Sequence, residues 1–248
     1  MYGKAYIRKP SGIVRIFQDL TELPYLLPNQ DNIVASFSAD TGLTSDTWEN
    51  QVIGGNDINL YNADIVSDEY VKVTGRNLNN TADSYGLVEI EVSMACTFYL
   101  VFKTESPYQY GNNIYAAGFG GETITANWWS LSVDTYNSPN CFGVDMYGTG
   151  FGDGQTTPID YHVAAVVRNT DGSGTIYVDN NTTANSSVNF SGTPHGKFCI
   201  GKLAKADGTL QTGANTPIYI RHLAIVNTSQ TPTQIFENIQ YLMNKYSI

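Results

Sequence analysis

The chain has 248 residues, of which 42% are hydrophobic and 15% are charged, with 17 Tyr, 10 Phe and 23 Gly. This length suits one or two domains, and many aromatic residues with frequent glycines favour β-structure with many turns. The 13 Lys and Arg against 23 Asp and Glu give a net charge of −10, which argues against nucleic acid and anionic membranes as partners. The sequence has no apolar run long enough to predict a membrane span.

Residues 1–30 are predicted to form an N-terminal arm. Two short apolar pieces, Ala5–Ile7 and Ile13–Phe17, precede Pro24 and Pro28. The first 15 residues contain no acid and four basic residues: Lys4, Arg8, Lys9 and Arg15. We therefore expect either a segment that docks on an acidic protein surface, or an edge strand and a loop. The segment has no apolar signal-peptide core, although removal of a signal would leave the same sequence.

From residue 32 the chain has the pattern of β-strands. Asn32–Phe37 and Tyr70–Gly75 are short apolar segments, and a loop-rich stretch lies between them. The longest alternation of apolar and polar residues runs from Val88 to Lys103. Because this exceeds an ordinary strand, it predicts two strands with a break near Ser93–Ala95.

Further strand-like segments follow at fairly regular spacing, separated by Gly, Asn and Asp turns. The clearest hairpin joins Tyr161–Arg168 to Gly174–Asp179. The other segments are 114–118, 128–133, 141–147 and 196–201. This rhythm predicts an all-β fold, a two-sheet antiparallel jelly-roll sandwich over residues 31–248.

The last stretch, Pro217–Ile248, predicts a strand, a turn and a helix. Thr231 is a suitable N-cap, Pro232 suits the first helical position, and Gln234 completes a capping box. One helical stripe is apolar: Ile235, Phe236, Ile239, Leu242, Met243 and Tyr246. Because this face needs an apolar partner, we expect the helix to lie against a sheet.

Five segments in this order resemble the laminin-G-like jelly roll of the concanavalin A-like lectin/glucanase superfamily. They are Trp48–Asp57, Tyr70–Gly75, Tyr161–Ala164, Ile176–Asn180 and Ile218–Ile248. The resemblance covers about residues 32–248 and implies a glycan-binding fold found in secreted and viral proteins. It departs from the family pattern at Ser36–Phe37 and Arg221, and the arm has no counterpart.

No set of residues predicts an enzyme. Glucanases of this superfamily carry three acids on one strand, whereas only Glu89 and Glu91 are present here, with a separation of roughly 6.5–7 Å expected on a strand. The histidines His162, His195 and His222 stand far apart, and His222 is predicted to be structural. The three cysteines match neither a disulfide framework nor a zinc site, and Cys96 and Cys199 are predicted to be buried.

Calcium is an alternative cofactor, because laminin-G-like domains often bind one ion at the rim of the sandwich. The resemblance nominates Asp57 and Asp153, together with other loop acids such as Asp171 and Asp207, as its ligands. The spacing of a calcium-binding loop is missing, and Asp-Gly pairs are primarily turn formers. No other cofactor is predicted.

Glycan binding requires exposed aromatic rings beside polar groups. The stretch 107–151 combines asparagines with seven candidate aromatic residues: Tyr108, Tyr110, Trp128, Trp129, Tyr136, Tyr147 and Phe151. Trp128 and Trp129 are adjacent, so on a strand they point to opposite faces and at most one lies in the core. The exposed one is a candidate sugar platform or interface anchor.

These features together predict a non-enzymatic binding or structural protein. Our leading hypothesis is a phage virion component that decorates a capsid, tail or fibre, docks on other virion proteins or on its own copies through the arm, and adheres to host surface glycans. The first alternative is a secreted or surface carbohydrate-binding module of a bacterium. A glycoside hydrolase of the same fold ranks third.

Overall fold

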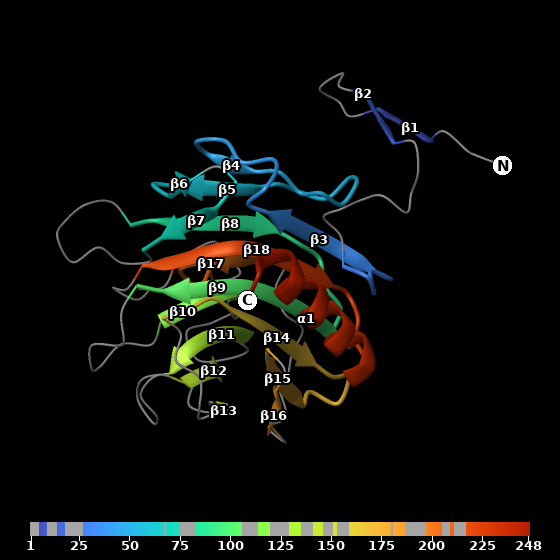
Figure 1. Cartoon of the computed structure of the whole chain (residues 1–248), viewed down its shortest axis with the longest axis vertical. Helices are drawn as coiled ribbons and strands as arrows, with labels where there is room; N and C mark the ends of the chain where they lie inside the picture. Colours follow the sequence, from blue (N-terminus) through green and yellow to red (C-terminus); the bar gives the residue numbers. More distant parts are fainter. Residues whose placement is uncertain are drawn as a thin grey trace.

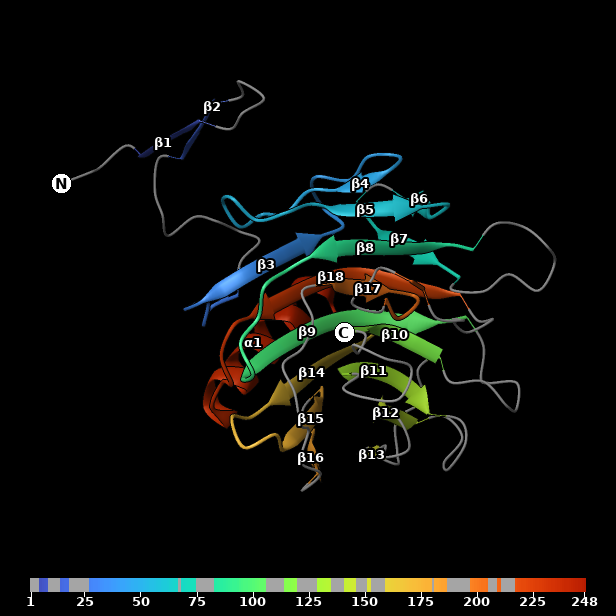
Figure 2. The same ribbon diagram turned by 180° about the vertical axis from the view of Figure 1, so that it is seen from behind.

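Two antiparallel β-sheets packed face to face form the body of the protein (Figures 1 and 2). The computed structural model describes residues 5–8, 14–17, 27–66, 68–74, 83–105, 114–119, 129–134, 141–145, 151–152, 159–179, 181–186, 197–204, 209–210 and 217–248. Within these residues, each large sheet has eight strands and the chain has one helix. The predicted all-β sandwich with a C-terminal helix is therefore confirmed.

Sheet I, the sheet in front in Figure 2, has the strand order β13-β12-β11-β10-β17-β8-β5-β4. Its strands are β4 (Thr47–Trp48), β5 (Ile58–Tyr61), β8 (Tyr85–Glu89), β10 (Ile114–Phe119), β11 (Trp129–Asp134), β12 (Cys141–Asp145), β13 (Phe151–Gly152) and β17 (Lys197–Ile200).

Sheet II, in front in Figure 1, has the order β16-β15-β14-β9-β18-β7-β6, and β3 pairs with β18 beside this path. Its strands are β3 (Ile33–Ser38), β6 (Asp64–Val66), β7 (Tyr70–Val73), β9 (Cys96–Thr104), β14 (His162–Arg168), β15 (Gly174–Val178), β16 (Asn181–Ser186) and β18 (Ile218–Val226).

The long alternation from residue 88 onward is divided between the two sheets. β8 ends at Glu89 in sheet I, and β9 begins at Cys96 in sheet II. The break predicted near Ser93–Ala95 is therefore confirmed, and it is the point where the chain crosses from one sheet to the other. The predicted hairpin is also confirmed, because β14 pairs with β15 from Ala164↔Val178 to Arg168↔Gly174.

The core between the sheets is built from alternate residues of both. Phe98 of sheet II and Phe119 of sheet I both meet Phe198 edge to face, with ring centroids 5.5 and 4.9 Å apart. Cys96 is also buried in this core, and Cys199 is buried as well, as predicted for small apolar side chains. In β18 a register shift between Ile220 and His222 explains the imperfect alternation, because it leaves Ile220 and Leu223 both facing the core.

Helix α1 (Pro232–Tyr246) packs on the outer face of sheet II. The capping box of Thr231 and Gln234 and the Pro at the helix start are present as predicted. A second apolar cluster lies between helix and sheet: Leu27, Tyr99, Val101, Val163, Ala165, Val167, Tyr177, Ala224, Val226, Ile235, Ile239 and Leu242. The sheet therefore has a core on both faces beneath the helix.

Parts of the predicted arm are described. β1 (Ala5–Arg8) and β2 (Val14–Phe17) pair with each other in a sheet of two strands. Leu27 is buried under α1, and the Asn29 amide donates to Asn238 Oδ1 at 2.9 Å. Residues 27–29 are thus attached to the helix. In the described part of the chain, no helix is both long and apolar enough to cross a membrane.

Candidate functional site

The aromatic residues that the sequence nominated for glycan binding fall mostly outside the described residues. Tyr108, Tyr110, Trp128, Tyr136 and Tyr147 all lie there. The backbones of Trp129 and Phe151 are described, and they begin β11 and β13 at one end of sheet I. The glycan site predicted in this stretch therefore stays a prediction.

A pair of stacked tyrosines stands on the outer face of sheet I near its other edge. In β5, Ile58 and Leu60 face the core, so Asn59 and Tyr61 face outward. Tyr85 of β8 lies directly opposite Tyr61 in the sheet register. The two rings stack with centroids 4.6 Å apart and planes at 18°. Tyr61 is 41% exposed, more than any other aromatic side chain among the described residues.

Polar groups surround this tyrosine pair. Lys202 Nζ lies 5.6 Å from the centre of the Tyr85 ring and forms an ion pair with Asp83. The Asn62 side chain donates to the Asp83 carbonyl at 3.0 Å. Burial, followed by the neighbouring Tyr61, raises the pKa of Tyr85, which keeps its phenol neutral. The patch therefore offers an exposed aromatic ring, two phenol hydroxyls and a carboxylate close together, and the buried Lys202 holds the carboxylate in place.

A row of alternating tyrosine and lysine crosses the outer face of sheet II. Lys103 of β9 and Lys72 of β7 both lie opposite Tyr219 of β18. Tyr161 directly precedes β14, whose His162 pairs with Phe102, so it stands beside Lys103. The lysine Nζ atoms lie 5.3 Å (Lys72) and 5.4 Å (Lys103) from the Tyr219 ring centre. This row lies beside α1, because Tyr161 packs against the apolar cluster under the helix and Arg221 reaches the Tyr246 carbonyl.

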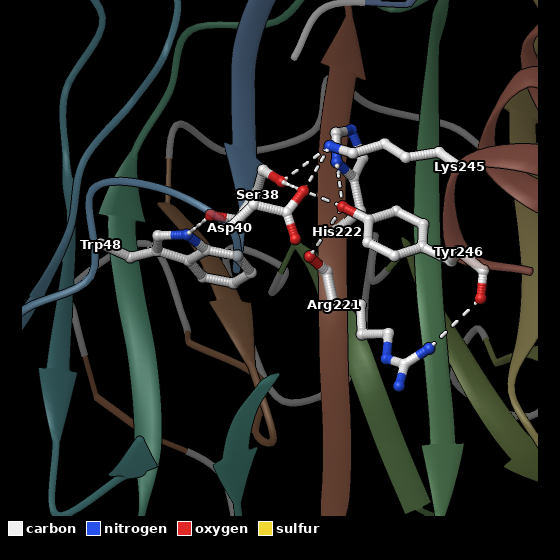
Figure 3. A network of polar contacts seen from close by, with 7 residues as sticks. All are labelled: Ser38, Asp40, Trp48, Arg221, His222, Lys245 and Tyr246. Carbon is white, nitrogen blue, oxygen red and sulfur yellow. Dashed lines mark hydrogen bonds and ion pairs between the residues drawn. The ribbon is translucent and has the colours of Figure 1, made fainter. Parts of the chain in front are cut away.

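A network of polar side chains fastens the end of α1 to the sandwich (Figure 3). Ser38 Oγ donates to Asp40 at 3.0 Å, and Lys245 Nζ reaches both Asp40 (2.8 Å) and Ser38 Oγ (2.9 Å). Tyr246 Oη lies 3.0 Å from Ser38 Oγ and 3.3 Å from His222 Nδ1.

The serine, lysine and histidine of this network resemble the components of a hydrolase, but Ser38 and His222 are both fully buried. A substrate has no access to the serine, so the network is structural. His222 is accordingly a buried histidine that hydrogen-bonds to Tyr246, as predicted.

The two acids considered for glycoside hydrolysis do not share a strand. Glu89 is the last residue of β8, whereas Glu91 lies in the link to β9. The Glu89 side chain is 72% exposed and lies 3.8 Å from Lys197 Nζ. The catalytic acid of a glycosidase lies in apolar surroundings and faces a second carboxylate. Glu89 is exposed and faces Lys197 instead.

The candidate calcium ligand Asp57 serves the loop in which it lies. Its Oδ1 accepts a hydrogen bond from the Asn50 amide at 2.8 Å, and Asn50 Oδ1 accepts from the amides of Ser36 and Val52. Asp153 lies outside the described residues. Among the residues whose structure is described, no group of three or more His, Cys, Asp or Glu side chains is arranged to hold a metal ion.

Comparison with solved structures places the sandwich among known folds. The chain is similar to a Trypanosoma rangeli sialidase in complex with sialic acid, with 16% identity and a TM-score of 0.61 over 97% of this chain and 36% of that one. It is similar to the botulinum neurotoxin type G receptor binding domain (10% identity, TM-score 0.60, 86% of this chain and 52% of that chain). It also resembles the binding domain of Paraclostridial Mosquitocidal Protein 1 (13%, 0.60, 86% and 53%).

These similarities concern the fold. The two antiparallel sheets form a β-sandwich. The chain spans between about a third and about a half of the structures it matches. No protein family matches it in sequence, and no curated protein does.

Sequence reasoning missed both tyrosine surfaces. The available signal was a tyrosine at a polar position of a strand: Tyr61 ends an alternation in which Ile58 and Leu60 are the apolar members, and Tyr219 stands between Ile218 and Ile220. An aromatic residue on the polar side of an alternating strand faces outward, so its ring is available for contact.

Proposed function

We propose that this protein is a non-enzymatic, laminin-G-like carbohydrate-binding protein of a phage virion. The stacked Tyr61–Tyr85 pair on the outer face of sheet I carries the binding part of the proposal. A pyranose ring has an apolar face of C–H groups and a rim of hydroxyls. The exposed ring of Tyr61 suits that face, and the phenols and the half-exposed carboxylate of Asp83 suit the hydroxyls.

The structural neighbours support this proposal. One is a sialidase in complex with sialic acid, and the other two are binding domains. The stacking of the two rings also favours binding, because each tyrosine restricts the other before the ligand arrives. Less side-chain freedom is then lost in the complex.

The test is a glycan array followed by titration of the best neutral glycan. Tyr61→Ala is expected to weaken binding about tenfold or more, as is usual for an aromatic residue at the centre of a contact. Ile53→Ala is the matched control, because Ile53 is also an exposed apolar side chain, at 51%. Equal binding by wild type and Tyr61→Ala, or no binding to any glycan, contradicts the proposal.

The virion part of the proposal rests on the basic arm. Four cations without an acid among the first 15 residues suit docking on an acidic protein surface. Antibodies against this protein are expected to label purified phage particles, and removal of residues 1–17 is expected to abolish the labelling. If the protein were instead found only on a bacterial surface, the secreted binding module would be the correct alternative.

A further inference from the structure

Three cations of this acidic protein lie close together on one face of a sheet. The chain has a net charge of −10 and only 13 Lys and Arg. Three of them, Lys72, Lys103 and Arg221, come from neighbouring strands β7, β9 and β18 on the outer face of sheet II. In an acidic protein such a group of cations attracts anions to one place.

Tyrosine rings separate these cations in a regular order. Across four strands the row reads Tyr161, Lys103, Tyr219 and Lys72. Because neighbouring strands lie about 4.8 Å apart, the two lysines leave the sheet about 10 Å apart, with the Tyr219 ring between them. Arg221 extends the group, since its guanidinium lies 3.9 Å from the Tyr161 ring centre and Lys103 Nζ lies 4.8 Å from it.

The charges along the row are not equally neutralised. At one end Glu105 lies 3.7 Å from Lys72 Nζ and accepts a hydrogen bond from Tyr219 Oη at 2.5 Å. At the other end, no carboxylate in the described part of the chain lies within ion-pair distance of Lys103 or Arg221. Arg221 donates one long hydrogen bond, of 3.4 Å, to the Tyr246 carbonyl at the end of α1.

The helix defines the border of this surface. α1 covers Val101, Val163 and Ala224 of the same sheet face, and its last residue, Tyr246, meets Arg221. Beyond that point the face changes from apolar to the tyrosine–lysine row. The residues under α1 are apolar, whereas those of the row beyond Tyr246 tolerate water and can bind anions.

We propose that this row is a second binding site, for carbohydrate chains that carry carboxylate groups, such as those of uronic acids. Lys103 and Arg221 bind a carboxylate, and Tyr219, which lies beside Lys103, contacts the sugar that carries it, while Tyr161 holds the two cations in place. An acidic peptide would match the cations but would make no use of the alternating rings. The site lies on the sheet opposite Tyr61 and Tyr85, so it does not depend on the function proposed for that pair.

Calorimetric titration with a short galacturonic acid oligomer tests this site, and the methyl ester of the same oligomer is the neutral counterpart. Wild-type protein is expected to bind the acid form, more weakly as salt is raised, and the ester much less. Lys103→Gln is expected to weaken binding of the acid form about tenfold, the usual effect of losing one charged hydrogen bond.

Lys197→Gln is the matched control, because Lys197 lies in sheet I and pairs with Glu89. This variant is expected to bind the galacturonic acid oligomer as wild type does. The proposal is overturned if wild type does not bind the oligomer, or if Lys197→Gln weakens binding as much as Lys103→Gln. It is also overturned if a short glutamate peptide binds as tightly, which would identify a protein-docking surface instead.

Discussion

The burial of His222 predicts that the protein loses stability in mild acid. The imidazole is completely buried, its Nδ1 lies 3.3 Å from Tyr246 Oη, and its Nε2 has no hydrogen-bond partner among the described residues. Burial, with a smaller contribution from the charge of Lys245, lowers the pKa of His222 from 6.5 to about 3 (Figure 3). The folded protein therefore holds this histidine neutral, whereas the unfolded chain binds a proton below pH 6.5.

The size of the effect follows from the two pKa values. Because the folded-state pKa is the lower one, the contribution to stability is complete above 6.5 and is lost as pH falls towards 3. Each pH unit within that window costs about 1.4 kcal/mol. Between about pH 7.5 and about pH 5, His222 alone is expected to lower the free energy of unfolding by about 2 kcal/mol.

Urea unfolding of wild type and His222→Asn over this pH range measures the effect. Asparagine keeps a polar atom near the position of Nδ1 for Tyr246 and has no proton to gain, so the variant is expected to lose about 2 kcal/mol less than wild type. His162→Asn is the control. His162 is partly exposed and lies 2.7 Å from Asp179. Its replacement is therefore not expected to reduce the loss of stability in acid. If wild type and His222→Asn lose equal stability, burial does not hold His222 neutral in the folded protein.

Three further predictions concern the helix and the thiols. Leu242 is fully buried between α1 and sheet II. Leu242→Ala is therefore expected to lower the free energy of unfolding by about 2–5 kcal/mol, and Leu242→Asp to prevent soluble folding. An unchanged urea midpoint for Leu242→Ala would contradict this packing. Tyr246→Phe removes the hydroxyl contacts to Ser38 and His222. It is expected to lower the free energy of unfolding by about 1–3 kcal/mol in the same assay. A change near zero would mean that the network does not hold the helix. Burial raises the pKa of Cys96 and of Cys199 to about 12. In a Cys141→Ser background, neither thiol is therefore expected to react with a disulfide reagent until urea unfolds the protein. Rapid labelling of the native protein would refute their burial.

Local sequence determined the elements whose signals lie within a few residues. Thr231, Pro232 and Gln234 specified the start of the helix, because a capping box needs only one turn of chain. The alternation from Val88 was too long for one strand, which predicted the break before β9. Apolar periodicity also separated core positions from surface positions, since burial follows the two-residue period of a strand.

The surfaces depended on which strands became neighbours, and only the tertiary structure decided this. Tyr61 and Tyr85 meet because β5 pairs with β8, and Tyr219 stands between Lys72 and Lys103 because β18 pairs with β7 and β9. These pairings join residues far apart in the chain. Their choice depends on the packing of the whole core, which no local pattern encodes. The sequence alone therefore established a sandwich with a helix on one side, and the register of its strands created the two tyrosine surfaces.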